Sequence, residues 1–168
     1  MSTCFKTIII YLTMEHIVTK IHNLLIKNRK TIAVAESCTG GLAANILTQI
    51  SGSSRYFILG MVVYHNKVKE KVLKIPSSII AKKGAVSEEV ARRMAEAVRK
   101  IAGTDFGIGI TGIAGPTAGS AQKPVGTVFI AINSRDKKIS KKFWFSGNRL
   151  TIRKNTALKS LELLKRML

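Results

Sequence analysis

The chain is poor in the residues that bind metals and form disulfides. Its 168 residues include two cysteines, three histidines and only nine aspartates and glutamates. Cys4 and Cys38 are far apart and form no metal-type or redox-type pair, so we expect free thiols and a reducing compartment. The histidines show no metal-ligand spacing apart from the six-residue gap between His16 and His22. We therefore expect no disulfide, no protein-borne metal site and no cofactor.

Long apolar runs and linkers are also missing. The run from Ile8 to Leu12 is too short to span a membrane, and it lacks an evident small-residue cleavage site. We expect neither secretion nor membrane insertion, and therefore a cytoplasmic protein. An amphipathic stretch runs from Glu15 to Asn28, and the chain has no Pro-rich or Ser-rich linker. The sequence predicts one folded domain over residues 14–168. Residues 1–13 are then either a frayed tail or an upstream extension of the reading frame.

Acidic residues are far outnumbered by basic ones. Twenty-eight lysines and arginines give the chain a formal net charge of +19. This imbalance favours a nucleic-acid, membrane-surface or phosphorylated partner without choosing among them. The basic residues extend from Lys6 to Arg166, with no aromatic interleaving and no zinc-finger or RNP pattern. We interpret them as a solvated basic surface and expect no specific nucleic-acid binding.

Segments typical of strands and of helices alternate along the chain. Strands are predicted at 31–35, 57–64, 105–111, 125–133 and 138–145, and helices at 15–28, 41–50, 66–73, 87–102 and 149–167. The last two strands are separated by Ser134 to Lys137, which predicts a hairpin and an antiparallel addition to the sheet. The alternation is typical of a layered α/β domain, and 168 residues are enough for one core. We expect a mixed β-sheet.

The segment from Ala35 to Gly41 (Ala-Glu-Ser-Cys-Thr-Gly-Gly) joins a predicted strand to a predicted helix. Its two glycines permit a tight turn. A helix that begins there directs free backbone N–H groups at the turn, which suits a carboxylate, a phosphate or an oxyanion. The segment therefore indicates part of an active site. The alternative is an N-cap with a tight turn, because Ser and Thr are common caps.

A second glycine-rich segment runs from Thr111 to Pro116 and continues through a small-residue loop to Lys123 and Thr127. It leaves the carboxyl end of a predicted strand, the edge at which layered α/β folds bind ligands. Glycines allow backbone to approach a ligand closely, and a lysine adds a point charge. The segment is neither a Walker loop nor a dinucleotide fingerprint. The alternative is an ordinary flexible loop.

Seven motifs occur in the order seen in one family. They are residues 35–41, residues 52–54, Tyr64-His65-Asn66 with Lys69, residues 84–88, residues 111–116, residues 123–127 and residues 145–149. From about residue 15 to 168 the chain resembles the C-terminal domain of the competence-damage-inducible protein CinA, a family that includes nicotinamide mononucleotide deamidases. The resemblance implies a three-layer α/β/α domain around a mixed β-sheet. It also implies a homo-oligomeric amidohydrolase that converts nicotinamide mononucleotide, a small-molecule nucleotide substrate, to nicotinate mononucleotide and ammonia.

A serine nucleophile needs a base to activate it. A Ser-His-Asp triad has poor support, because His65 is the only histidine near a motif and no carboxylate is clearly linked to it. A lysine is the better candidate, because burial beside another cation lowers a lysine pKa enough for it to accept a proton. By resemblance Lys69 is this base and Ser37 is the nucleophile. Cys38 is a rival nucleophile beside Ser37.

The other predicted site residues lie in the same motifs. The resemblance implies Tyr64, Ser54 and Thr111 as polar catalytic partners, and Thr39, Gly40, Gly41, Gly112, Ala114, Lys123, Arg149 and Arg153 as substrate-binding residues. Backbone N–H groups from Thr39 to Gly41 are the candidates for holding the tetrahedral oxyanion. Arg149, and more weakly Lys123 and Arg153, are the candidates for the 5′-phosphate. The alternative function is a basic nucleotide- or nucleic-acid-binding module of the same fold without catalysis.

Overall fold

The computed structural model describes residues 3–117 and 120–168. Its strands are β1 (Ile32–Glu36), β2 (Phe57–Val62), β3 (Phe106–Gly112), β4 (Thr127–Asn133) and β5 (Lys138–Trp144). Its helices are α1 (Thr3–Lys27), α2 (Leu42–Leu47), α3 (Asn66–Leu73), α4 (Ser77–Lys83), α5 (Glu88–Ala102) and α6 (Arg149–Lys165), with a short 3₁₀ turn η1 (Ser53–Arg55) before β2.

The five strands form one mixed sheet in the order β2-β1-β3-β4-β5. β1 runs parallel to β2 and β3, whereas β4 is antiparallel to both β3 and β5. The first three strands are joined through helices, which is the connection that parallel strands require. β4 and β5 are joined by a tight hairpin in which the Ser134 N–H donates to the Lys137 carbonyl at 2.8 Å. The predicted mixed sheet and its antiparallel hairpin are confirmed.

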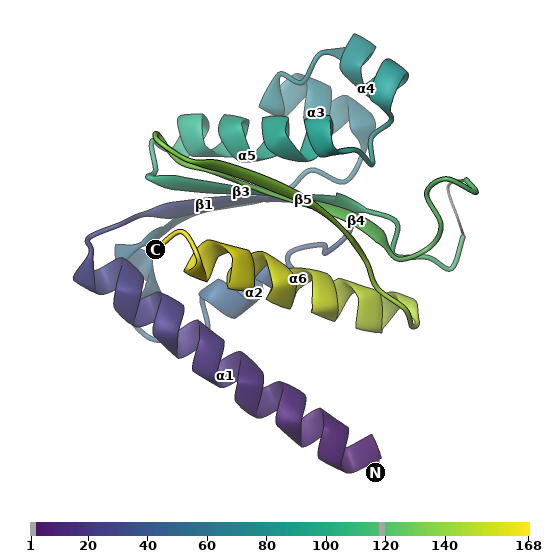
Figure 1. Cartoon of the computed structure of the whole chain (residues 1–168). Coiled ribbons are helices and arrows are strands. Elements are labelled where there is room, and N and C mark those ends of the chain that lie inside the picture. The colour runs from purple at the N-terminus through teal and green to yellow at the C-terminus, as the bar shows by residue number, and fades with distance from the viewer. Residues whose placement is uncertain (1–2, 118–119) are drawn as a thin grey trace.

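Helices cover both faces of the sheet (Figure 1). α3, α4 and α5 lie on one face, and α1, α2 and α6 lie on the other. Successive residues of β1 alternate between the two cores: Ile32 and Val34 pack towards α1, α2 and α6, and Ala33 and Ala35 towards α3, α4 and α5. This central strand is buried on both faces, as its continuous apolar run predicts. The predicted α/β/α layering is therefore confirmed.

Two glycines in β3 bring α5 close to the sheet. A Cβ at Gly107 would lie 2.1 Å from the Ala95 carbonyl oxygen, and one at Gly109 would lie 2.2 Å from the Ala91 carbonyl oxygen. Only glycine allows this approach between helix and strand. The approach fixes α5, and with it the residues just before α5 that line the candidate site described below.

The structure differs from the sequence predictions mainly at helices. α4 follows Pro76 and was not predicted, α2 ends at Leu47 rather than at residue 50, and α1 begins at Thr3 rather than at Glu15. α4 has only seven residues and thus too short an apolar pattern to detect. No helix in residues 3–117 and 120–168 combines the length and the apolar character needed to cross a membrane. The domain boundary at residue 14 stays a prediction.

Candidate active site

The turn that carries Ser37 begins where β1 ends. The Ser37 N–H donates to the Ile110 carbonyl at 3.0 Å, so the turn stays attached to β3 after the strand is over. Gly40 and Gly41 then adopt left-handed φ angles of 61° and 93°. A residue with a Cβ is strained in this region, which explains the paired glycines. The chain reverses here and enters α2.

Glu36, the last residue of β1, occupies the start of α2 with its own side chain. Its carboxylate accepts hydrogen bonds from the N–H groups of Gly41 at 3.1 Å, Ala43 at 3.1 Å and Ala44 at 2.8 Å. The Gly40 N–H donates to the Ser37 carbonyl at 3.1 Å. The prediction that the Gly40 and Gly41 N–H groups hold a substrate oxyanion is therefore corrected, because both already have acceptors within the chain.

The N–H groups of Cys38 and Thr39 remain as donors at the turn. Neither donates to a backbone carbonyl within the part of the chain that the structure describes, and the Cys38 N–H lies against the thiol of its own side chain. Sequence reasoning quoted Glu36 as part of a motif and gave it no role. An acidic residue at the end of a buried strand, directly before a helix start, was the signal that could have identified the cap.

Lys69 reaches the Ser37 hydroxyl from α3. Its side chain is only 1% exposed, and its Nζ lies 3.2 Å from Ser37 Oγ and 2.9 Å from the Tyr64 carbonyl oxygen. No carboxylate forms an ion pair with it among the described residues. Burial lowers the pKa of the Lys69 ammonium below its ordinary value, and the nearby Cys38 only partly opposes this shift. A lysine in this setting can serve as a base.

Cys38 shares the turn with Ser37 but has a different chemical state. Its side chain is 5% exposed, and burial raises the pKa of the thiol to about 12. The group therefore stays protonated at neutral pH, whereas cysteine nucleophiles react as thiolates. Gly112 accommodates the sulfur, because a Cβ at this position would lie 3.0 Å from Cys38 Sγ. These observations favour Ser37 over Cys38 as the nucleophile.

Ser37 and Lys69 line a cavity of about 200 Å³ at the carboxyl ends of β1, β2 and β3. Of the predicted site residues, the cavity brings together Ser37, Tyr64, Lys69, Thr111, Gly112, Ala114 and Arg149, and its lining is completed by Cys38, Asn66, Ala85 and Val86. The Thr111 hydroxyl donates to the Ala85 carbonyl at 2.9 Å, which ties β3 to the loop before α5. Sequence reasoning did not identify Asn66, Ala85 or Val86 individually, although all three lie within the quoted motifs.

Arg149 bridges two walls of this cavity. Its Nη1 donates to the Gly115 carbonyl at 2.7 Å, and its Nη2 donates to the Tyr64 hydroxyl at 2.8 Å. The residue is the first of α6, a helix capped by Asn148, whose Oδ1 accepts the Thr151 N–H at 2.9 Å. Because a guanidinium carries five N–H groups, donors remain for an anion at the cavity mouth.

The fold and this geometry can be compared with those of known proteins. The model of the CinA C-terminal domain matches residues 14–168. The chain belongs to the CinA C-terminal domain family. This CinA domain is 49% identical over 138 residues to a CinA-like protein of Geobacter sulfurreducens, and the match covers 82% of this chain but 33% of that protein. It is also 48% identical over 155 residues to a protein of Thermoanaerobacter pseudethanolicus, with 92% of this chain and 37% of that protein covered. The chain thus spans about a third of the length of these curated relatives.

Solved structures agree with the family assignment. The competence/damage inducible protein CihA of Agrobacterium tumefaciens matches with a TM-score of 0.89 at 35% identity, over 92% of this CinA domain and 94% of that chain. A CinA superfamily protein of Escherichia coli matches with a TM-score of 0.88 at 29% identity, over 92% and 90% of the two chains.

Two side chains predicted to bind the substrate phosphate, Arg153 and Lys123, instead donate hydrogen bonds to backbone carbonyls of the CinA domain. Arg153 donates from Nε at 3.1 Å and from Nη2 at 2.8 Å to the Thr39 carbonyl. Lys123 donates to the Lys83 carbonyl at 3.0 Å, at the end of α4. Neither side chain lines the cavity that holds Ser37. Arg153 therefore braces the turn that carries Ser37, and Lys123 ties the glycine-rich loop to the end of α4.

Ser54 lies at the wrong end of β2 for a catalytic partner within one chain. It belongs to η1, which precedes β2, whereas Tyr64 follows the carboxyl end of the same strand. A six-residue strand spans about 20 Å at roughly 3.3 Å per residue, so Ser54 is remote from Ser37. The prediction of Ser54 as a catalytic residue is corrected for a single copy of the CinA domain.

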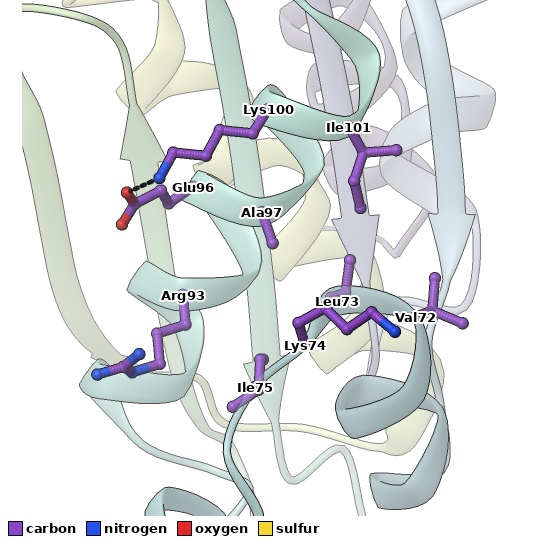
Figure 2. Close-up of a pocket in the computed structure, with 9 residues that line it drawn as sticks. All are labelled: Val72, Leu73, Lys74, Ile75, Arg93, Glu96, Ala97, Lys100 and Ile101. Carbon is purple, nitrogen blue, oxygen red and sulfur yellow. Dashed lines mark ion pairs between the residues drawn. The ribbon is translucent and has the colours of Figure 1, made fainter.

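A larger cavity, of about 430 Å³, lies between α5 and the segment that follows α3 (Figure 2). Its lining is apolar at Leu73, Ile75 and Ala97, and an ion pair joins Lys100 to Glu96 at 2.7 Å. None of the predicted site residues of the CinA domain lines it. It holds no nucleophile next to a base, so the smaller cavity is the candidate active site.

Proposed function

We propose that this CinA domain is an amidohydrolase that converts nicotinamide mononucleotide to nicotinate mononucleotide and ammonia by a serine–lysine mechanism. One observation carries the proposal: a buried Lys69 Nζ that has no ion-pair partner among the described residues and lies 3.2 Å from Ser37 Oγ. The resemblance to the deamidases of the family supplies the substrate. A neutral amine at this distance activates a serine hydroxyl that is otherwise a weak nucleophile.

The first half of the reaction forms an acyl-enzyme. Neutral Lys69 takes the proton of the Ser37 hydroxyl as Oγ attacks the carboxamide carbon, and the Tyr64 carbonyl holds the resulting ammonium by its 2.9 Å contact. The tetrahedral oxyanion is assigned to the Cys38 and Thr39 N–H groups. A contact of this kind is typically worth about 3–4 kcal/mol of barrier. Lys69 then gives its proton to the amide nitrogen, the C–N bond breaks and ammonia leaves.

The second half returns the enzyme to its starting state. Lys69, neutral again, takes a proton from water as the water oxygen attacks the nicotinoyl ester on Ser37. The bond between the acyl carbon and Ser37 Oγ breaks, and Oγ recovers the proton from Lys69. Nicotinate mononucleotide is released, and one base serves both halves because each half begins with a neutral Lys69.

Substrate orientation in this proposal depends on the charge at the cavity mouth. Arg149 keeps unused N–H donors after its bonds to Gly115 and Tyr64, and an arginine fork matches a phosphate well. Thr111 Oγ1 uses its proton on the Ala85 carbonyl, so its lone pairs can accept an N–H of the carboxamide. The pyridine ring then lies in the cavity with its phosphate at the mouth.

Ammonia release tests this proposal most directly. We would measure it with nicotinamide, its riboside, its mononucleotide and NAD, using the wild type, Ser37→Ala and Cys38→Ala. We expect the mononucleotide to be the best substrate, Ser37→Ala to lose about 1,000-fold or more in kcat, and Cys38→Ala to stay within a few-fold of wild type.

The same panel has outcomes that contradict the proposal. Near wild-type deamidation by Ser37→Ala would rule out the serine mechanism, and a preference for unphosphorylated nicotinamide would remove the role of Arg149. Release of no ammonia, together with duplex affinity that falls steeply with salt, would identify the basic binding module instead.

A further inference from the structure

Two charged side chains are almost fully buried in the described part of the domain, Lys69 and Glu36, each 1% exposed. The proposed mechanism uses Lys69 and leaves Glu36 without a function. A buried carboxylate is costly unless hydrogen bonds or an opposite charge compensate it. No lysine or arginine pairs with Glu36 among the described residues, so the compensation comes from elsewhere.

Three backbone N–H groups supply that compensation. Glu36 Oε2 accepts from Gly41 and Ala43, each at 3.1 Å, and Oε1 accepts from Ala44 at 2.8 Å. Both carboxylate oxygens are therefore used. Hydrogen bonds to an ionised acceptor are stronger than neutral ones, so three of them form a firm attachment.

These bonds close a loop around the nucleophile. Ser37 lies between the backbone of Glu36 and the N–H groups that the Glu36 side chain binds. On the other side of the turn, Arg153 donates two hydrogen bonds to the Thr39 carbonyl, at 3.1 and 2.8 Å. An anionic side chain thus holds the N–H groups of the turn, and a cationic one holds a carbonyl. A shift of the Ser37 backbone relative to Lys69 would strain one of these contacts.

We infer that Glu36 is a positioning residue: its carboxylate is a built-in anion that holds Ser37 at reacting distance from Lys69. The inference rests on the proposed function for its catalytic part. The carboxylate also occupies donors that an anionic group of a substrate would otherwise use. The substrate phosphate is thereby directed away from the Ser37 turn and towards Arg149.

The inference is tested by removing the Glu36 carboxylate and adding a free carboxylate to the buffer. Glu36→Ala removes a CH₂–COO⁻ group, and acetate supplies the same group as a free anion. We expect the variant to melt about 5–10 °C below wild type, and acetate to raise its Tm while chloride at equal ionic strength does not. Wild type should show no such response to acetate.

Kinetics separate positioning from general damage. We expect kcat of Glu36→Ala to fall about 100-fold, since a displacement of about 1 Å has a cost of this size. The KM should stay within about threefold of wild type, because Glu36 does not line the cavity. Acetate should restore at least tenfold of the lost kcat. A normal kcat in Glu36→Ala, or a Tm that acetate leaves unchanged, would overturn the inference.

A matched variant controls for unspecific effects of acetate. Glu88→Ala removes an exposed glutamate that is also at the start of a helix, α5, and acetate should change neither its Tm nor its kcat. If Glu36→Ala does not fold, Glu36→Gln is the variant to test. Its amide keeps one acceptor oxygen but places an NH₂ group against a backbone N–H that needs an acceptor. We expect about a tenfold loss of kcat without rescue by acetate, and a wild-type kcat would contradict the inference. The Tm measurements remain valid even if the wild type deamidates nothing.

Discussion

The two ends of the parallel strands differ in whether their charged side chains are paired. At the carboxyl ends of β1, β2 and β3, Lys69 is buried against Ser37 and has no ion-pair partner in the described chain. At the amino ends, Asp105 accepts from the Lys30 ammonium at 2.9 Å and from the N–H and hydroxyl of Thr31 at 2.9 and 3.0 Å. The first end holds a buried amine beside a hydroxyl, the arrangement on which the proposed reaction depends. The second end holds hydrogen bonds that join the starts of β1 and β3.

The pKa values of Lys69 and Asp105 are both lowered, but the effect on the charged form is opposite for an amine and a carboxyl group. Burial lowers the pKa of Lys69, which disfavours its charged form. Partial burial acts to raise the pKa of Asp105, but the hydrogen bonds from Lys30 and Thr31 outweigh it and lower the pKa, which favours the charged form. A lowered pKa therefore marks a destabilised ammonium at the reactive end and a stabilised carboxylate at the structural end.

The largest expected effect is that of Lys69→Met. We expect kcat to fall about 1,000-fold or more, because the base of the proposed mechanism is lost. The free energy of unfolding should rise by about 1 kcal/mol, because the cost of burying an amine whose pKa falls on folding is removed. Ammonia release and urea unfolding measure the two quantities. A variant that is both inactive and clearly less stable would show that Lys69 holds the structure instead of lowering its stability.

The same variant has a characteristic pH dependence. Between the lowered pKa of folded Lys69 and its ordinary value of 10.5, the unfolded chain holds more protons than the native state, so wild-type stability should rise with pH. Lys69→Met should lack this rise. Activity of the wild type should increase with pH through the lowered pKa, because the base must be neutral.

A smaller effect, on stability alone, is expected from Asp105→Asn. Loss of the charged acceptor for Lys30 and Thr31 should lower the free energy of unfolding by about 1 kcal/mol, a value kept small because solvent screens this partly exposed pair, and should leave kcat within about twofold of wild type. In the wild type this contribution is complete above the ordinary pKa of 3.8 and disappears as pH falls through the lowered folded pKa. Asp136→Asn, at the exposed hairpin, is the matched control and should leave unfolding unchanged. A loss of activity in Asp105→Asn would mean that the two ends are coupled.

The smallest expected effect is that of Ser54→Ala. Ser54 is exposed and precedes β2, so kcat for ammonia release should stay within about twofold of wild type if one copy holds a complete site. A loss of tenfold or more would instead mean that the amino end of β2 in a second copy completes the cavity. The homo-oligomer expected from the resemblance would then be required for activity.

Most of the fold could be read from local patterns. The apolar run at β1, the hairpin at 134–137 and the amphipathic segment that became α5 have periodicities and turn residues that specify their structure within a short window. α4 could not be read in this way, because seven residues after a proline carry too little periodicity. The start of α1 at Thr3 was missed because the amphipathic pattern begins only near Glu15.

The candidate site was also predictable only in part. Resemblance named Ser37, Lys69, Tyr64, Thr111 and Arg149, and the structure gathers all five around one cavity. It could not distinguish Arg149, which lines the cavity, from Arg153, one turn later, which binds the Thr39 carbonyl in the turn that carries Ser37. Both are arginines near the start of one helix, and only the neighbours of each guanidinium tell them apart.

The sequence by itself determined the alternation of strands and helices and the tight glycine turn after Ser37, since backbone preferences and apolar spacing act over a few residues. The tertiary structure alone decided which polar groups each buried charge meets. Lys69 and Ser37 are 32 positions apart, and Arg153 and Thr39 are 114 positions apart. Even Glu36, beside Ser37, meets the N–H groups that its carboxylate binds only when β1 ends against the start of α2. Burial, hydrogen bonding and pKa depend on these distances in space, and no short stretch of sequence contains them.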